Sequence, residues 1–339
     1  MNAVSKERGR RVKRLISSSV AIALLVAGCA ARTPAPTPPP APVLAPAPTP
    51  APAPAPGQSE GLAPYAIAFW DEQKGLIAGQ AGCPVRCGDY VIALTEDGGV
   101  HWREVYRGAE RVGELAVVPG GAWASTAQGL LRSTDGGRTW QATASGYAVP
   151  TFAGASVGWA LTATEGNRWN IEGPIYATQD GGATWKPLVS PCTGNTAGTA
   201  AIHLVSETEG WAGCVGQPGA GQQKKVLFRT TDGGVTWQEA TLDFGGYLNG
   251  IFFRPGGRGW MWLGRGVPGV TANGGRSWQW LDTFQPESRD VWDIWMLTDQ
   301  TGYLLVRDNN DPRHFKLMKT TDGAASATLV TQWPIDPPR

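Results

Sequence analysis

One eight-residue pattern recurs along this chain and limits its architecture more than any other feature. The first copy reads Thr-Glu-Asp-Gly-Gly-Val-His-Trp over residues 95–102, and four further copies keep the Gly-Gly pair and the closing Trp. A sixth copy begins Thr-Thr-Asp-Gly at residue 320 and then has Ala where the second Gly and the Trp would stand. The third positions of successive copies lie 38, 45, 52, 41 and 49 residues apart. A period of roughly 40–50 residues built from short strands is typical of β-propeller blades.

The pattern resembles the Asp-box, also called the bacterial neuraminidase repeat, and the resemblance covers about residues 65–329. The copies that read Asp-Gly-Gly-x-Thr-Trp, preceded by Gly-Trp, are most similar to the photosystem II stability/assembly-factor family. Sialidases, sortilin-type receptors and xyloglucan hydrolases also carry Asp-boxes, so the resemblance implies a fold and leaves the function open. We therefore expect an all-β propeller of six four-stranded blades, with a seventh possible only if short pieces at the two ends combine.

The residue types of the box indicate a structural role. An Asp carboxylate can accept backbone N–H groups across a tight turn, and Gly tolerates the positive φ that such a turn needs. We expect the Trp ring to bury about 200 Å² against the blade, so that Trp140→Ala or Trp185→Ala costs about 3–5 kcal/mol. Each box lies in a different blade, which argues against shared metal ligation or catalysis. These positions are Asp97, Trp102, Asp135, Trp140, Asp180, Trp185, Asp232, Trp237, Asn273, Trp278 and Asp322.

A second repeated pair precedes the boxes. Gly158-Trp159, Gly210-Trp211 and Gly259-Trp260 each open the expected second strand of a blade, as Gly302-Tyr303 does in the last repeat. We predict that these aromatic side chains pack between neighbouring blades.

The N-terminal segment predicts export and lipidation. Six basic residues lie in the first 15 positions, and an apolar run over residues 16–28 follows them, which is typical of a signal peptide. The run ends Leu-Val-Ala-Gly-Cys, which resembles a bacterial lipobox with Cys29 as the lipidated residue. We expect a signal peptide at 1–28, the lipidated Cys and a Pro/Ala-rich spacer at 29–57, and the propeller at 58–339. The predicted location is the outer side of the bacterial cytoplasmic membrane, or the outer membrane.

Charge and cysteine usage fit an exported protein. The whole chain carries 29 basic and 28 acidic residues; without residues 1–28 it carries 23 and 27, a net charge of −4. No basic stripe or nucleic-acid motif is present, so we expect no nucleic-acid partner, no cofactor and a monomer. Four Cys follow Cys29, and of the three formal pairings we expect Cys83–Cys87 and Cys192–Cys214. The three His lie in separate repeats, which argues against a metal site.

Strand order places the candidate binding face opposite the boxes. Turns between strands one and two, and between three and four, share one face with the boxes, while the longer and more variable loops share the other. Binding usually depends on variable loops of a rigid scaffold, and aromatic residues with Arg are favoured anchors. The candidate residues there are Arg168, Trp169, Lys224, Lys225, Tyr247, Asn249, Arg265, Arg289, Trp292 and Arg307.

Three functions remain open from the sequence. The first is a non-catalytic propeller that binds protein partners or assists their assembly at the cell envelope, as the resemblance to assembly factors implies. The second is a module that binds glycan or peptidoglycan, which the 16 Trp residues favour. The third is a sialidase-like glycosidase, but the family's Phe/Tyr-Arg-Ile-Pro element has only a partial counterpart, Phe253-Arg254-Pro255, in the fifth repeat.

Overall fold

The structure, a computed structural model, divides the chain into two compact units, residues 1–51 and residues 52–339. The first unit lies outside the described part of the chain, so all that follows concerns the second. The described residues are 62–81, 88–162, 171–219, 222–240, 245–264, 267–281, 290–307 and 314–334.

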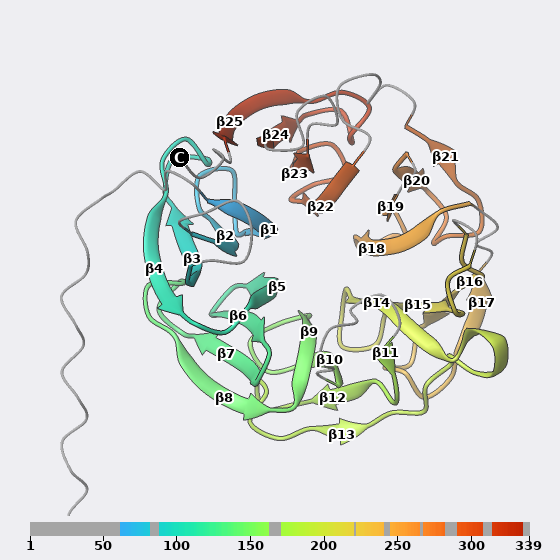
Figure 1. Cartoon of the computed structure of the whole chain (residues 1–339). Helices are drawn as coiled ribbons and strands as arrows, with labels where there is room; N and C mark the ends of the chain where they lie inside the picture. The colour runs from blue at the N-terminus through green and yellow to red at the C-terminus, as the bar shows by residue number, and fades with distance from the viewer. Residues whose placement is uncertain are drawn as a thin grey trace, which may run out of the picture. The chain divides into compact units, whose positions relative to one another are not determined.

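These residues form a six-bladed β-propeller, as Figure 1 shows. Blade 1 contains β1 (Ala63–Phe69), β2 (Gly75–Gln80), β3 (Tyr90–Thr95) and β4 (Arg103–Gly108). Blade 2 contains β5 (Val112–Val118), β6 (Gly121–Thr126), β7 (Gly129–Ser133) and β8 (Gln141–Ser145). Blade 3 contains β9 (Tyr147–Phe152), β10 (Gly158–Thr162), β12 (Tyr176–Thr178) and β13 (Lys186–Pro187).

The second half of the ring repeats the arrangement. Blade 4 contains β14 (Gly198–Leu204), β15 (Gly210–Val215), β16 (Lys225–Thr230) and β17 (Gln238–Ala240). Blade 5 contains β18 (Tyr247–Phe253), β19 (Gly259–Gly264), β20 (Gly269–Thr271) and β21 (Gln279–Trp280). Blade 6 contains β22 (Asp290–Met296), β23 (Gly302–Arg307), β24 (His314–Thr320) and β25 (Thr328–Pro334). The prediction of six blades is confirmed, and the alternative of seven is wrong.

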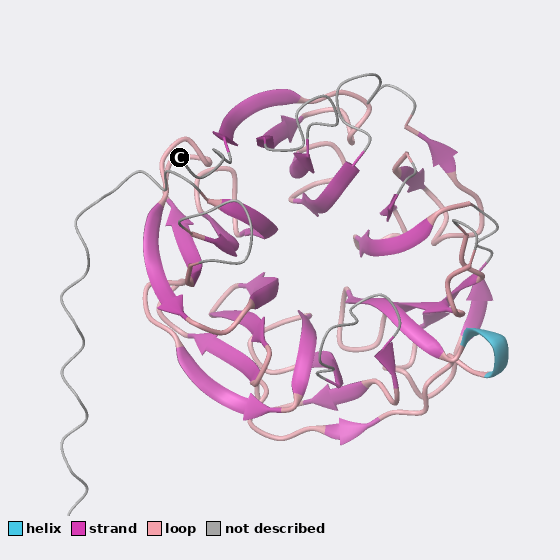
Figure 2. Cartoon of the chain, in the orientation of Figure 1, coloured by secondary structure: helices cyan, strands magenta, loops and turns pink. Residues whose placement is uncertain are grey.

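Helical structure is nearly absent, as Figure 2 shows: the described residues contain one short 3-10 helix, η1 (Gly194–Thr196). No helix in the described ranges is both long enough and apolar enough to cross a membrane. One extra strand, β11 (Ile171–Glu172), leaves blade 3 and pairs with β14, which makes the sheet of blade 4 five-stranded.

The Asp-boxes lie on the predicted face. In five blades, the first Gly of the box donates its N–H to a carbonyl oxygen in the turn between strands one and two of the same blade. In blade 1, for example, Gly98 N–H donates to Gln73 at 2.8 Å. The box turns and the turns between strands one and two therefore share one face, and the remaining loops share the other, which we call the loop face.

Stacked rings join neighbouring blades. Trp123 of blade 2 stacks on Phe152 of blade 3 with ring centroids 3.6 Å apart, and Trp211 of blade 4 stacks on Phe253 of blade 5 at 4.0 Å. The four predicted aromatic residues, Trp159, Trp211, Trp260 and Tyr303, are each at most 1% exposed, as is Trp123 of blade 2. Their predicted role between blades is confirmed.

Within the described residues, the ring closes without sharing a strand between the first and last blades. Phe69 of blade 1 stacks on Tyr303 of blade 6 at 3.8 Å. The Trp295 indole of blade 6 donates to the Phe69 carbonyl at 2.7 Å. The Ile67 amide of blade 1 donates to the Asp293 carboxylate of blade 6 at 2.9 Å. Packing and hydrogen bonds between β1 and β22–β23 thus hold the seam.

Candidate functional site

A central channel in the propeller forms a cavity with a volume of about 250 Å³. The innermost strands of all six blades line it, and Figure 1 shows them converging around the axis of the ring. These strands are β1, β5, β9, β14, β18 and β22. Each of them begins at the loop face, so their N-terminal ends form the mouth of the channel there.

A β-bulge interrupts the pairing of every innermost strand near the mouth. Such a bulge re-aims a side chain locally and is frequent near functional sites. One lining residue from each bulge forms a set that we call the bulge ring. In blade order its members are Tyr65, Glu114, Val149, Ala200, Asn249 and Trp292.

The bulge ring is chemically one-sided. Blades 5, 6, 1 and 2 contribute Asn249, Trp292, Tyr65 and Glu114, whereas blades 3 and 4 contribute the small apolar side chains of Val149 and Ala200. On the apolar side, β11 also pairs with the mouth end of β14, through Ile171 with Thr199 and Glu172 with Gly198. The polar and aromatic members of the bulge ring therefore lie on one arc of the mouth, formed by blades 5, 6, 1 and 2.

Two guanidinium groups lie over the aromatic members of this arc. Arg111 lies over the Tyr65 ring at 5.1 Å, and the Tyr65 hydroxyl donates to Gln80 at 3.1 Å. Burial raises the pKa of Tyr65, so its hydroxyl stays protonated. Arg307 lies over the Trp292 ring at 5.9 Å, and Trp292 also meets Phe315 edge-on at 5.3 Å.

Two carboxylates also line the mouth. The Ser125 hydroxyl donates to Glu114 at 3.1 Å. Asp293, next to Trp292, accepts the amides of Ile67 and Ile294, each at 2.9 Å. These donors help to fix the two carboxylates in position.

The other end of the channel is aromatic on three consecutive blades. His203, Phe252 and Trp295 occupy equivalent places near the ends of β14, β18 and β22 and all line the cavity. His203 lies 4.5 Å from Phe252, and burial lowers the pKa of His203 to about 4, so the imidazole is neutral at physiological pH. Arg254 lies at this end and pairs with Asp299 at 3.4 Å.

Part of the predicted candidate set is found at this mouth. Asn249 and Trp292 line the channel, Arg307 lies over Trp292, Tyr247 begins β18, and Lys224 is exposed before β16. Sequence reasoning missed Tyr65 and Glu114, which share the bulge position with Asn249 and Trp292; aligning the six innermost strands would have paired them. The predicted residues Arg168, Trp169, Arg265 and Arg289 lie outside the described residues.

The prediction for Lys225 needs correction. Its side chain is buried, and its ammonium donates to the carbonyl oxygens of Gln223 at 2.7 Å and Gly246 at 2.8 Å. A buried ammonium requires such acceptors, and these hold the chain that leads into β18. Lys225 therefore supports the loop face from within and is not presented to a ligand.

The predicted disulfide between Cys192 and Cys214 is present. It ties the linker between blades 3 and 4 to β15, and the Thr199 hydroxyl contacts the Cys192 sulfur at 3.1 Å. Cys29, Cys83 and Cys87 lie outside the described residues.

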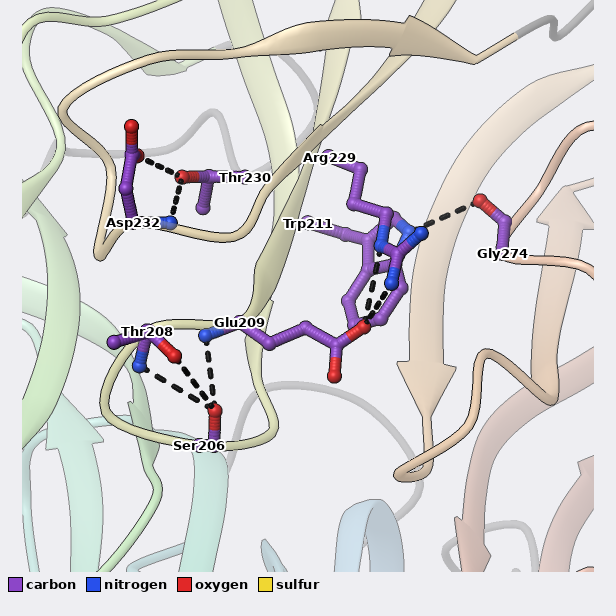
Figure 3. A network of polar contacts seen from close by, with 8 residues as sticks. All are labelled: Ser206, Thr208, Glu209, Trp211, Arg229, Thr230, Asp232 and Gly274. Atoms are coloured by element: carbon purple, nitrogen blue, oxygen red, sulfur yellow. Dashed lines mark hydrogen bonds and ion pairs between the residues drawn. The ribbon is translucent and has the colours of Figure 1, made fainter.

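The Asp-boxes have the local hydrogen bonding that their sequence predicts. In blade 4, the Thr230 hydroxyl donates to Asp232 at 2.7 Å, as Figure 3 shows. The amide and hydroxyl of Thr236 also donate to Asp232, at 2.9 and 2.5 Å. The Thr236 hydroxyl, followed by its amide, lowers the pKa of Asp232 to about 2. No group of three or more potential metal ligands occurs in the part of the chain that the structure describes.

The box Trp residues differ from the expectation of full burial. Trp102 is buried, but Trp140, Trp185, Trp237 and Trp278 are half-buried. Their indoles lie at the outer edge of the blade, where Trp140 donates to the Gly137 carbonyl at 3.1 Å. The fully buried Trp residues are those of the second strands.

Comparison with known proteins agrees with this geometry. A family model described as the BNR/Asp-box repeat matches residues 131–142. The chain is an Asp-box β-propeller. No curated protein gives a significant match to the sequence.

Solved structures show the same fold at low sequence identity. YCF48 from Cyanidioschyzon merolae is 17% identical, with a TM-score of 0.51 over 80% of this chain and 86% of that protein. A structure of YCF48 bound to D1 peptide is 18% identical, with a TM-score of 0.50 over 80% of this chain and 82% of that one. A GH74 xyloglucanase from Xanthomonas campestris is 16% identical, with a TM-score of 0.51. The match covers 82% of this chain and 47% of the xyloglucanase.

Proposed function

We propose that this Asp-box propeller is a non-catalytic, extracytoplasmic protein that binds a protein partner, or assists its assembly, at the mouth of its channel. The bulge ring is the observation that carries this proposal. One repeated backbone position presents six different side chains, while the Asp-boxes on the opposite face repeat nearly unchanged. Variation on one face of a constant scaffold is typical of a binding surface.

The chemistry of the mouth supports a protein partner. Trp, Tyr and Arg are the side chains most enriched at the energetic centres of protein interfaces. Here Tyr65 with Arg111, and Trp292 with Arg307, form two such pairs. The solved structure of YCF48 with D1 peptide concerns a protein of the same fold that binds a peptide, which adds support by analogy.

Binding can be tested by site-specific photocrosslinking in cells. A photoreactive residue at Arg111 or Lys224, both exposed on the loop face, is expected to capture a partner protein. The same residue at Val235, which is 73% exposed on the Asp-box face, serves as the matched control. Equal capture from both faces, or none from the loop face, would contradict the proposal.

We also propose that lipidation of Cys29 holds the protein at the outer side of the cytoplasmic membrane, or at the outer membrane. The apolar run that ends in Leu-Val-Ala-Gly-Cys supports this, because acyl chains contribute about 0.8 kcal/mol of membrane affinity per buried CH₂. Wild-type protein is expected to incorporate a palmitate analogue, and Cys29→Ser to lose the label. An unlabelled wild type would refute lipidation without affecting the proposed binding face.

Glycan binding is the alternative that one observation favours. Exposed aromatic rings stack on sugars, and Tyr65 and Trp292 both line the mouth. A glycan array and a cell-wall pull-down with the full chain would separate the two: retention on glycan that is lost in Trp292→Ala supports the alternative. Turnover of aryl-glycosides would instead indicate a glycosidase.

A further inference from the structure

Backbone groups of the innermost strands face the channel. In each blade, one lining residue stands two places before the residue that pairs with the first Gly of the second strand. The Ile67 amide donates to Asp293 of blade 6, so it points away from its neighbouring strand β2. Since the six positions share one register, the backbone groups of each member face away from the second strand and toward the channel. We call these residues the edge ring: Ile67, Ala116, Pro150, Ile202, Ile251 and Ile294.

Three blades offer no free amide at the edge ring. The amides of Ile67 and Ile294 both donate to the Asp293 carboxylate, at 2.9 Å each. Pro150 has no N–H, and Pro is tolerated in a strand where the ladder does not use that group. Blades 6, 1 and 3 are therefore closed to a further strand at this level.

The other three blades present an open sheet edge. The amides of Ala116, Ile202 and Ile251 have no acceptor among the described residues. Unpaired backbone groups along a strand edge are a template for another strand. The chain itself shows such pairing, because β11 adds to β14 on the side away from β15 and covers the mouth end of β14.

Blade 5 has a second unpaired group beside its open edge. Asn249, two residues before Ile251, lines the channel, and its Oδ1 is buried without a hydrogen-bonding partner. The other two such side-chain atoms in the described ranges, Arg132 Nε and Arg258 Nε, belong to guanidinium groups that lie over Trp rings. A buried acceptor without a partner favours a ligand that brings a donor. Figure 1 shows β18, which carries Asn249 and Ile251, facing the axis of the ring.

The depth and width of the channel limit the occupant. Below Ile251, the backbone of Phe253 is hydrogen-bonded to His203 of blade 4, so the open edge ends there. The volume of about 250 Å³ is below the roughly 300–1,000 Å³ of typical small-molecule pockets and suits a narrow extended chain. We propose that an extended segment of the protein partner enters from the loop face and pairs with the edge of β18 at Ile251, an inference that rests on the proposed binding function. One N–H of the segment donates to Asn249 Oδ1, and main-chain hydrogen bonds supply the affinity.

Ligand-observed NMR titration of the full chain with a small peptide tests this inference. The probe is N-acetyl-tetraalanine N-methylamide, whose side chains carry no charge and no hydrogen-bonding group, and it is expected to bind the wild type. Four analogues, each methylated at one Ala nitrogen, lack one donor apiece. At least one of them is expected to bind about three- to tenfold more weakly. No binding of the parent peptide, or equal binding of all four analogues, overturns the inference.

A proline substitution tests the protein side of the same contact. Ile251→Pro removes the amide that faces the channel, and Pro150 shows that the fold accommodates Pro at this register. Ile251→Ala loses comparable packing but keeps the amide, so it is the reference. The Pro variant is expected to bind the tetraalanine probe about three- to tenfold more weakly than the Ala variant. Ile202→Pro makes the same change in blade 4 and is expected to bind more tightly than Ile251→Pro.

Thermal unfolding of each variant checks that its fold is intact. Equal binding by Ile251→Pro and Ile251→Ala, or a loss confined to Ile202→Pro, overturns the assignment to β18. If Ile251→Pro does not fold, the methylated peptides still decide the question. The photocrosslinking result separates this failure from that of the proposed function. Loop-face capture without peptide pairing removes only the strand site, whereas loss of capture removes the binding function itself.

Discussion

The indole N–H of Trp211 in blade 4 donates a 3.1 Å hydrogen bond to the carbonyl oxygen of Gly274 in the Asp-box of blade 5. Figure 3 shows this bond, with Arg229 beside the indole and Glu209 bonded to Arg229. Trp123 and Trp260 bond the following boxes in the same way, at Gly181 and Gly323. In these three pairs, the box of one blade accepts a hydrogen bond from the second strand of the preceding blade.

Trp211→Ala is expected to lower the free energy of unfolding by about 3–5 kcal/mol, because it empties a fully buried site between two blades. Trp140→Ala is expected to cost less than that, since Trp140 is half-buried at the blade edge. Denaturant titrations of the two variants and the wild type measure the difference. Equal losses of unfolding free energy in the two variants would show that burial of a Trp between blades does not determine its contribution to stability.

The decayed sixth box offers a stabilising change. Ala324 takes the place of the second Gly and has φ of 73°, a region that is costly for a residue with a Cβ. Ala324→Gly is expected to raise the free energy of unfolding by about 0.5–1 kcal/mol, after allowing for the greater freedom of Gly in the unfolded chain.

The reverse substitution in an intact box is the control for this change. Gly234 has φ of 91°, and a Cβ there would lie 2.8 Å from the Leu188 side chain. Gly234→Ala is therefore expected to lower the melting temperature while Ala324→Gly raises it. A fall in both variants would mean that Ala324 contributes packing that outweighs its backbone conformation.

The box carboxylates predict a dependence of stability on acid. The Thr236 hydroxyl and amide lower the pKa of Asp232 to about 2, below the ordinary value of 3.8. A lowered pKa means that this stabilisation is full above about pH 4 and is lost as the pH falls through about 2. The contribution of Asp232 to the unfolding midpoint in denaturant is therefore expected to be constant between pH 7 and about pH 4. Below about pH 4 the midpoint is expected to decrease.

Asp232→Asn tests the origin of that acid loss. Asn273 fills the same position in blade 5, where its amide donates to Ser277 at 2.8 Å, so the substitution is compatible with the turn. The variant is expected to lose less stability than the wild type between pH 4 and 2. An identical acid transition in both proteins would assign the loss to other groups.

The Cys192–Cys214 disulfide closes a segment with a sequence separation of 22 residues. Replacing both Cys with Ala is expected to cost about 2–4 kcal/mol, chiefly because the unfolded chain gains freedom. Thermal unfolding of the double variant measures this cost. Adding a reductant to the double variant, which lacks this bridge, shows how much of any further loss comes from other cysteines.

The fold was predictable because its determinants are local. The turn needs a Gly-Gly pair, a side-chain oxygen that accepts its amides and a Trp after it, so five of the six repeats keep a recognisable pattern, as at residues 230–237. The role of Trp211 between blades was predictable for the same reason. The degree to which each box Trp is buried was not predictable, because Trp140 and Trp102 close the same pattern and yet differ in burial. Trp102 lies beside Trp333 of blade 6, a contact that the pattern does not encode.

The candidate site was only partly predictable because it depends on register. Lys225 and Lys224 are adjacent in sequence, yet one is buried on carbonyl oxygens and the other is exposed. Tyr65 and Glu114 reach the channel because a bulge shifts the pairing of their strands, and no local motif marks that shift. Such positions are identified only when the six innermost strands are aligned with one another.

The seam between blades 1 and 6 has an evolutionary consequence. Apart from β11, the strands of each blade are consecutive in the chain, and within the described residues Phe69, Tyr303 and Trp295 join blades 1 and 6 by ring packing and a hydrogen bond without a shared strand. Duplication or deletion of one repeat therefore adds or removes a four-stranded sheet, and only the pair of β11 with β14 would be broken, where repeats 3 and 4 are separated. A circular permutant that starts at a different repeat is likewise expected to form the same propeller, with its seam between another pair of blades.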